Sequence, residues 1–79
     1  QGGVPKIGKK ILEEASEVVE AAAEDGEDGR NHLIYEAGDL IYHLFVMLGH
    51  KNISLAEVES ELARRFGVSG LDEKSARDQ

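Results

Sequence analysis

Apolar side chains recur every three or four positions in three stretches of the chain, which is the spacing of one face of an α-helix. The pattern predicts a first helix over about residues 5–23, a second over about residues 31–48 and a shorter third that starts after Ser54. No stretch shows the alternation of apolar and polar residues that is typical of a strand. The expected fold class is therefore all-α.

Polar and turn-forming residues separate the three predicted helices. Residues 24–29 contain two Asp-Gly steps and no apolar side chain, so they predict a turn. Gly49 is expected to end the second helix, and Ser54 with Glu57 has the spacing of a capping box that opens the third. Residues 67–70 are expected to end the third helix, and residues 71–79 to form a polar tail.

The apolar faces are larger than three helices of one small domain can cover. The second helix is apolar on most sides between Asp39 and Leu48, which predicts neighbours on more than one side. The third helix carries a stripe that is expected to join the core, made of Leu55, Val58, Leu62 and Phe66. We therefore expect helical hairpins to pair in a homodimer, with a core of the four-helix-bundle type.

Two acidic pairs, Glu14 with Glu17 and Glu36 with Asp39, are the strongest candidates for chemistry. Residues three apart on a helix point the same way. Glu14 falls inside the apolar stripe of the first helix, although burying an unpaired carboxylate is unfavourable. Acidic pairs are usually solvated, but two pairs with one member in a core stripe favour a site. If the helices pack together, four carboxylates meet, and their oxygens suit Mg²⁺.

Composition narrows the range of functions. The formal net charge of −7 over 79 residues argues against binding nucleic acid through a basic surface. The longest apolar run is too short to span a membrane, and the lack of cysteine suits a reducing cytoplasm. Lys6, Lys9 and Lys10 gather at the start of the first helix. Lys10 is expected either to pair with Glu14 or to contact a phosphate.

The histidines and tyrosines carry weaker signals. His43 follows Asp39 by one helical turn, and we interpret it as a hydrogen-bonded neighbour of the site rather than a metal ligand. His32 and His50 lie near predicted helix ends and indicate no function. Tyr35 and Tyr42 are interpreted as packing residues rather than as contacts to a base or ribose.

The acidic motif resembles that of the all-α NTP pyrophosphohydrolases, with Glu13-Glu14-x-x-Glu17 followed by Glu36-x-x-Asp39. Within that superfamily the flanking sequence is most similar to the phosphoribosyl-ATP pyrophosphatases. The similar stretches are residues 3–10, 39–44, 54–58 and 67–74, with Arg77 beyond them. The resemblance covers almost the whole chain and implies a single domain over residues 1–79.

This resemblance implies Mg²⁺-dependent hydrolysis of phosphoribosyl-ATP to phosphoribosyl-AMP and pyrophosphate, in histidine biosynthesis and in the cytoplasm. The implied metal ligands are Glu14, Glu17, Glu36 and Asp39. Glu13 and Glu14 are the candidate catalytic residues, although Glu13 falls on the opposite face of its helix. The implied contacts to substrate phosphates are Lys6, Lys10, Lys74 and Arg77. No Gly-rich phosphate loop of the Walker type is present in the sequence.

Members of this family usually carry a further helical segment before the point where this chain starts, so an upstream segment is expected. Some relatives also work beside a cyclohydrolase domain. Two other functions stay open from the sequence. One is a housecleaning pyrophosphatase that acts on dUTP, dCTP or an abnormal NTP through the same metal site. The other is an acidic helical module that dimerises without catalysis.

Overall fold

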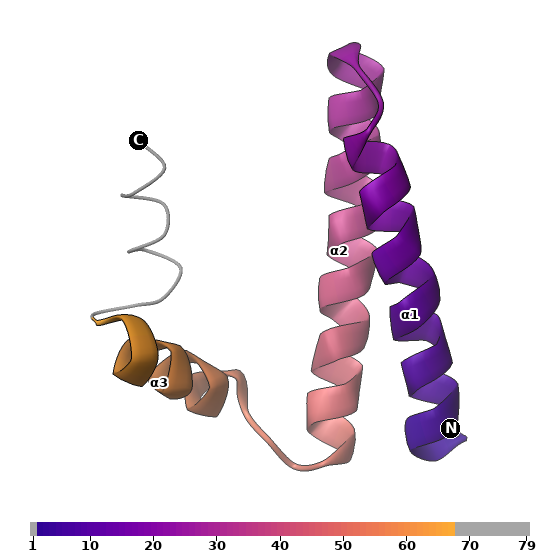
Figure 1. The fold of residues 1–79 in the computed structure, drawn as a ribbon. Helices are drawn as coiled ribbons and strands as arrows, with labels where there is room; N and C mark the ends of the chain where they lie inside the picture. The colour runs from indigo at the N-terminus through magenta and orange to yellow at the C-terminus, as the bar shows by residue number, and fades with distance from the viewer. Residues whose placement is uncertain (1, 68–79) are drawn as a thin grey trace.

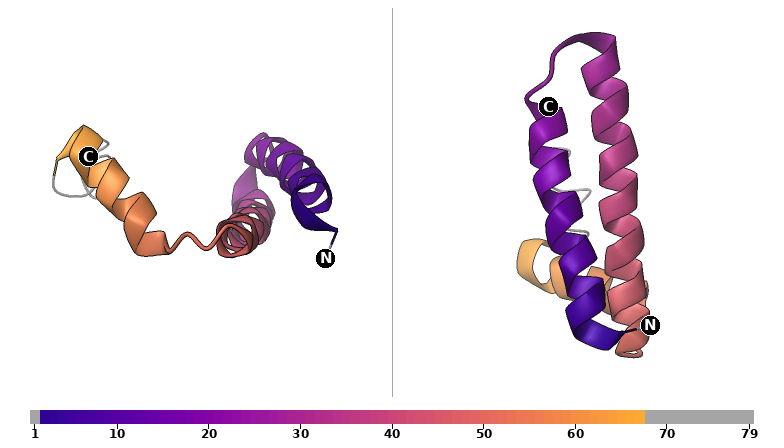
Figure 2. Two further views of the ribbon diagram at one scale, coloured as in Figure 1. Left: turned by 90° about the horizontal axis from the view of Figure 1, so that it is seen from below. Right: turned by 90° about the vertical axis from the view of Figure 1, so that its right-hand side faces the viewer.

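The computed structural model describes residues 2–67, which form three helices: α1 (Gly3–Ala22), α2 (Gly26–His50) and α3 (Leu55–Phe66). α1 and α2 pack side by side as an antiparallel hairpin, and α3 projects from the far end of α2 (Figure 1). Two further views place α3 well away from α1 (Figure 2). Residues 2–67 contain no strand, so the all-α prediction is confirmed.

The hairpin core is small. Ile7 near the start of α1 and Ala21 near its end are the buried apolar residues, and Ala21 is fully enclosed. The small side chain of Ala21 lets the helices approach closely beside the interhelical turn. α1 starts and ends within two residues of the predicted bounds. Along residues 2–67, no helix is both long enough and apolar enough to cross a membrane.

The interhelical turn is shorter than predicted. α2 already begins at Gly26, so the expected turn over residues 24–29 was wrong over its second half. Glu27 and Asp28 occupy the first turn of α2, where negative charge is favoured by the helix dipole. Gly29 is buried, and a Cβ there would lie 2.6 Å from the carbonyl oxygen of Glu24. Glycine is therefore needed at this position for packing against the turn, not for chain reversal.

The end of α2 also differs from the prediction. The helix continues through Gly49 to His50 and ends in a Schellman motif. Asn52 adopts φ 60°, and its N–H donates to the Gly49 carbonyl at 3.0 Å. The N–H of Ile53 donates to the Leu48 carbonyl at 2.9 Å. Asn is one of the few residues other than glycine that tolerate this left-handed conformation, so Asn52 supplies the stop expected of Gly49.

α3 starts as predicted but does not pack as predicted. The Ser54 hydroxyl accepts from the Glu57 N–H, and the Glu57 carboxylate accepts from the Ser54 N–H at 2.9 Å, which confirms the capping box. No residue of α3 is buried. Leu55 and Phe66 at the ends of the predicted core stripe are 47% and 45% exposed. Within one chain the stripe joins no core, because the hairpin offers it no covering surface.

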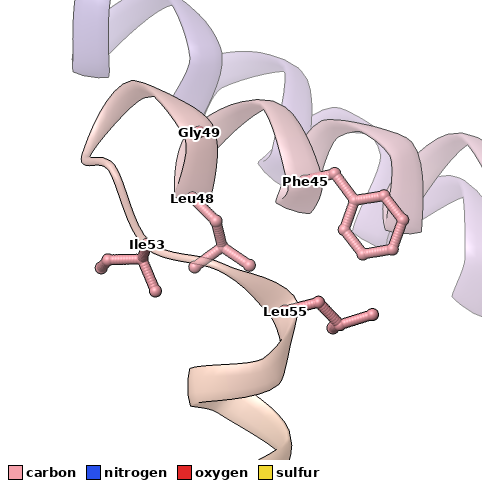
Figure 3. Close-up of a pocket in the computed structure, with 5 residues that line it drawn as sticks. All are labelled: Phe45, Leu48, Gly49, Ile53 and Leu55. Atoms are coloured by element: carbon pink, nitrogen blue, oxygen red, sulfur yellow. The ribbon is translucent and has the colours of Figure 1, made fainter.

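α2 likewise leaves much apolar surface uncovered, including Ile41, Leu44 and Phe45. Its burial on most sides is not achieved within one chain. Near its end, a hollow of ≈ 190 Å³ opens between α2 and the start of α3 (Figure 3). The hollow is lined by Leu48, Ile53 and Leu55 together with Phe45 (Figure 3). The homodimer that would cover these surfaces stays a prediction.

Candidate metal and substrate site

Glu14 lies at the interface of the hairpin, as its place in the apolar stripe predicted. It is only 5% exposed. His43 of α2 is its closest basic neighbour, with Nδ1 2.7 Å from Oε1. The ring N–H fits a hydrogen bond to the Asp39 carbonyl at 3.2 Å, whereas its angle toward Glu14 does not. Glu14 Oε1 is therefore close to a nitrogen but accepts no hydrogen bond.

Glu36 of α2 lies beside Glu17 of α1. It is 8% exposed, and its Oε2 lies 3.1 Å from Nε2 of His32. Its other oxygen, Oε1, is buried without a hydrogen-bond partner. Each helix thus contributes one buried glutamate with one unsatisfied oxygen, and such groups are uncommon unless a ligand or water completes them.

Glu17 joins this pair from the exposed edge of α1. The adjoining carboxyl of Glu36 is the main cause that raises the pKa of Glu17. The negative charge of Glu36 raises it further, and the charge of Glu14 adds to the same effect. Glu17 of α1 therefore lies beside Glu36 of α2 and near Glu14, while the meeting of all four acids at one ion stays a prediction.

Asp39 lies one turn beyond Glu36 on α2 and is half-buried. Within residues 2–67, no three acidic or histidine side chains converge tightly enough to hold a metal ion in their present rotamers. The acids are gathered along adjacent turns rather than around one point.

His32 is the residue that sequence reasoning missed. Its Nδ1 lies 3.0 Å from the Glu24 carboxylate and its Nε2 lies 3.1 Å from Glu36. Both hydrogen bonds raise the pKa of His32, and the bond with Glu24 has the larger effect. Because both ring nitrogens face carboxylates, the doubly protonated imidazolium is favoured. The four-residue spacing from His32 to Glu36 was the available signal.

His43 behaves as interpreted from the sequence. Its Nδ1 contacts the Asp39 carbonyl and Glu14, and its ring lies edge-on to Tyr42 with centroids 5.0 Å apart. His43 therefore contacts the backbone of Asp39 and the side chain of Glu14, and links these two residues across the hairpin. Such neighbours orient ligands and are often as important for a site as the ligands themselves.

The comparison with known proteins decides the family. A family model described as phosphoribosyl-ATP pyrophosphohydrolase matches residues 1–66. The chain belongs to this family. It is 59% identical over 76 residues to the phosphoribosyl-ATP pyrophosphatase of Rhodopirellula baltica, a match covering 96% of this chain and 63% of that protein. No solved structure matches the chain at a significant level.

Other family members give a similar picture. The phosphoribosyl-ATP pyrophosphatase of Geotalea daltonii is 49% identical over 98% of this chain and 70% of its own length. That of Geobacter sulfurreducens is 47% identical over 98% of this chain and 68% of its own length. The chain thus spans about two thirds of the length of these curated relatives.

The other residues implied by the family pattern lie in different surroundings. Glu13 is exposed on α1 and forms an ion pair with Lys10 at 3.8 Å, so Lys10 pairs with Glu13 rather than with Glu14. Lys6 and Lys10 both line a hollow between α1 and α2. Lys74 and Arg77 lie outside the described residues.

The acidic cluster fits a hard divalent cation. Glu14 Oε1 and Glu36 Oε1 are buried acceptors without donors, and the nearby Glu36 carboxyl raises the pKa of Glu17. A cation bound between α1 and α2 would supply a partner for these oxygens once the side chains change rotamer to converge on it. Carboxylate oxygens are the ligands that Mg²⁺ prefers, and it commonly keeps several waters beside them.

Proposed function

We propose that this protein hydrolyses phosphoribosyl-ATP to phosphoribosyl-AMP and pyrophosphate in the presence of Mg²⁺, which is the second step of histidine biosynthesis. The observation that carries the proposal is the pair of buried glutamates, Glu14 and Glu36, each with an unsatisfied oxygen at one helix interface. Membership of the phosphoribosyl-ATP pyrophosphohydrolase family supports the choice of substrate. A cytoplasmic location follows from that pathway.

In this proposal the ion is held by the four acids Glu14, Glu17, Glu36 and Asp39. A bound Mg²⁺ would polarise phosphate oxygens and lower the pKa of a coordinated water. A triphosphate could not otherwise approach these acids, because two unit charges ~5.5 Å apart at an effective dielectric of ~20 repel by about 3 kcal/mol. The oxygen of water bonds to the α phosphorus while the bond to the pyrophosphate oxygen breaks.

The remaining residues position the metal ligands or bind the substrate. His32 and His43 hold Glu36 and Glu14 at 3.1 Å and 2.7 Å. Lys6 and Lys10 are the proposed contacts to substrate phosphate. Glu13 remains a candidate for accepting a proton from the attacking water, although it is exposed and pairs with Lys10.

We also propose that the active form is a homodimer. The supporting observation is the apolar surface left open on α2 and α3, with Phe45 48% exposed beside the hollow at the start of α3. A second copy carries the same surface and can cover it in a symmetric contact. Light scattering should give twice the chain mass for the native protein, and Leu55→Asp should shift it toward the monomer.

The deciding experiment measures pyrophosphate release with Mg²⁺ from phosphoribosyl-ATP, with dUTP, dCTP and ATP assayed in parallel. The proposal expects turnover of phosphoribosyl-ATP well above the other three. Preferential turnover of a deoxynucleotide would support the metal site but contradict the proposed substrate and its pathway. If none of the four is hydrolysed, even by a longer chain that spans the full length of the relatives, the enzymatic proposal is wrong.

A further inference from the structure

A second hollow lies between α1 and α2, beside the buried acids. It measures ≈ 220 Å³ and is lined by Lys6, Ile7, Lys10, Tyr42, His43 and Val46. Its lining combines apolar, aromatic and positively charged side chains. Ile7 and Val46 supply apolar surface, Tyr42 supplies an aromatic ring, and two lysines supply positive charge. Small-molecule sites combine an apolar lining with a few placed polar groups in this manner.

The lysine at the outer end of the hollow is held in place. Gly2 has φ +79°, and a Cβ there would lie 2.6 Å from Cδ and 2.7 Å from Cβ of Lys6. The aliphatic stem of Lys6 therefore packs against the Gly2 backbone, which only glycine permits. Lys10 follows one helical turn later, and its one ion pair among the described residues is the exposed contact with Glu13 at 3.8 Å. No carboxylate is among the described residues that line the hollow.

Lys6, at the end of the hollow away from the acids, is too distant from them to bind the same phosphate group. At 1.5 Å per residue, Lys6 lies about 12 Å along α1 from Glu14 and about 16 Å from Glu17. The phosphate that reacts must lie at the acids with the metal. An anion at Lys6 must therefore belong to another part of the substrate. The volume of the hollow is also below the ~300 Å³ at which pockets begin to hold a whole drug-sized ligand.

We propose that this hollow binds the phosphorylated ribose of the phosphoribosyl group, and so selects phosphoribosyl-ATP over ATP. The inference rests on the function proposed above. A phosphate monoester carries a charge of about −1.5 to −2 near neutral pH, which matches the two ammonium groups of Lys6 and Lys10. The Tyr42 ring, 61% exposed, provides a face for the sugar. ATP lacks this phosphorylated ribose and leaves the hollow unfilled.

Kinetics of matched variants test the role of the lysines. Lys6→Gln should raise KM for phosphoribosyl-ATP about 10-fold or more, as expected for losing a hydrogen bond to a charged group, with kcat changed less than about 2-fold. Lys9→Gln makes the same charge change on the same helix, but Lys9 does not line the hollow, so it serves as the control. Equal KM values for these two variants would overturn the proposal.

Direct binding separates this proposal from the proposed activity. Ribose 5-phosphate, added without Mg²⁺, should shift the NMR signals of Ile7 and Val46 in the native protein and not in Lys6→Gln. Tyr42→Ala should weaken the binding of ribose 5-phosphate without affecting the binding of inorganic phosphate. Binding in a protein that does not hydrolyse phosphoribosyl-ATP would keep the subsite and reject the activity. Hydrolysis with no binding of ribose 5-phosphate at these residues would keep the activity and reject the subsite.

Discussion

Acidic side chains lie on both the α1–α2 hairpin and α3, yet their surroundings are opposite. On α3, Glu57 caps the helix and Glu61 accepts from Arg64 Nε at 3.0 Å and Arg65 Nε at 2.9 Å. On the hairpin, Glu14 and Glu36 are buried and each keeps one oxygen without a donor. The arginines beside Glu61 lower its pKa, whereas Glu36 raises the pKa of Glu17.

The difference shows which acids serve the fold and which are available for a ligand. Glu57 and Glu61 have partners within their own helix, so they stabilise α3 at neutral pH. The hairpin acids are brought together across two helices at a cost in stability, because neighbouring carboxylates repel and buried ones lose water. An arrangement that weakens the free protein is expected where a cation is bound.

Removing a hairpin acid should have the largest effect. Glu17→Gln and Asp39→Asn keep the side-chain shape and remove one proposed ligand. Losing a partner of a ligand typically costs about 10–100-fold, so losing a ligand should lower turnover more than about 100-fold. Pyrophosphate release measures this, and circular dichroism checks that the helices remain. Glu20→Gln is the matched control on α1, since Glu20 is exposed. Full activity in either ligand variant would remove that residue from the site.

Mg²⁺ should stabilise the folded protein through the hairpin and not through α3. At a concentration 100 times the Kd, binding to the native state adds about 2.7 kcal/mol to the free energy of unfolding. Thermal melts with and without Mg²⁺ measure this shift. Glu61→Gln should keep it and Glu17→Gln should lose most of it. Equal shifts in these two variants would mean that the ion does not distinguish the two acidic regions.

Breaking the cap of α3 should have a smaller, local effect. Ser54→Ala removes the hydroxyl that accepts from the Glu57 N–H, and loss of such a cap costs about 1 kcal/mol. Amide hydrogen exchange should become faster in α3 and stay unchanged in the hairpin, because α3 barely contacts it. Ser60→Ala, an exposed change within the same helix, is the control. Faster exchange throughout the hairpin would contradict the independence of α3.

The two acidic regions should respond to pH in opposite directions in the metal-free protein. The raised pKa of Glu17 gives stability at low pH that is lost as the pH rises above 4.5. The raised pKa of His32 gives stability that is lost as the pH rises above 6.5. The lowered pKa of Glu61 gives stability above pH 4.5 that is lost as the pH falls.

Urea unfolding followed across this pH range measures the effect. Glu17→Gln and His32→Gln should each flatten the decline on the alkaline side, and Glu61→Gln should flatten the decline on the acid side. A change on the same side in all three variants would show that the carboxylates of the hairpin and of α3 do not differ as described.

Periodicity and residue chemistry predicted much of this arrangement. The stripe that contains Glu14 predicted its burial, whereas the convergence of the two i, i+3 pairs on one ion stays a prediction. The capping box fixed the start of α3. These features depend on residues within one or two helical turns of each other, so the sequence displays them directly.

Features that depend on more distant contacts were missed. The acidic residues Glu27 and Asp28 resembled a turn by composition, but the helix dipole favours them in the first turn of α2. The role of His32 depends on Glu24, eight positions earlier and across the interhelical turn. The stripe of α3 is amphipathic, but amphipathicity does not specify which surface covers it.

Gly29 links the geometry of the interhelical turn to the alignment of the acids. Its backbone packs against Glu24, and this contact fixes the position of α2 along α1. Inserting one residue into α2 between Gly29 and Glu36 would shift Glu36 by about 1.5 Å along the helix and rotate it by about 100° relative to the Gly29 contact. Glu36 would then turn away from Glu17. Surface loops usually tolerate changes of length, whereas the number of helical residues between Gly29 and Glu36 sets the register of the acidic site.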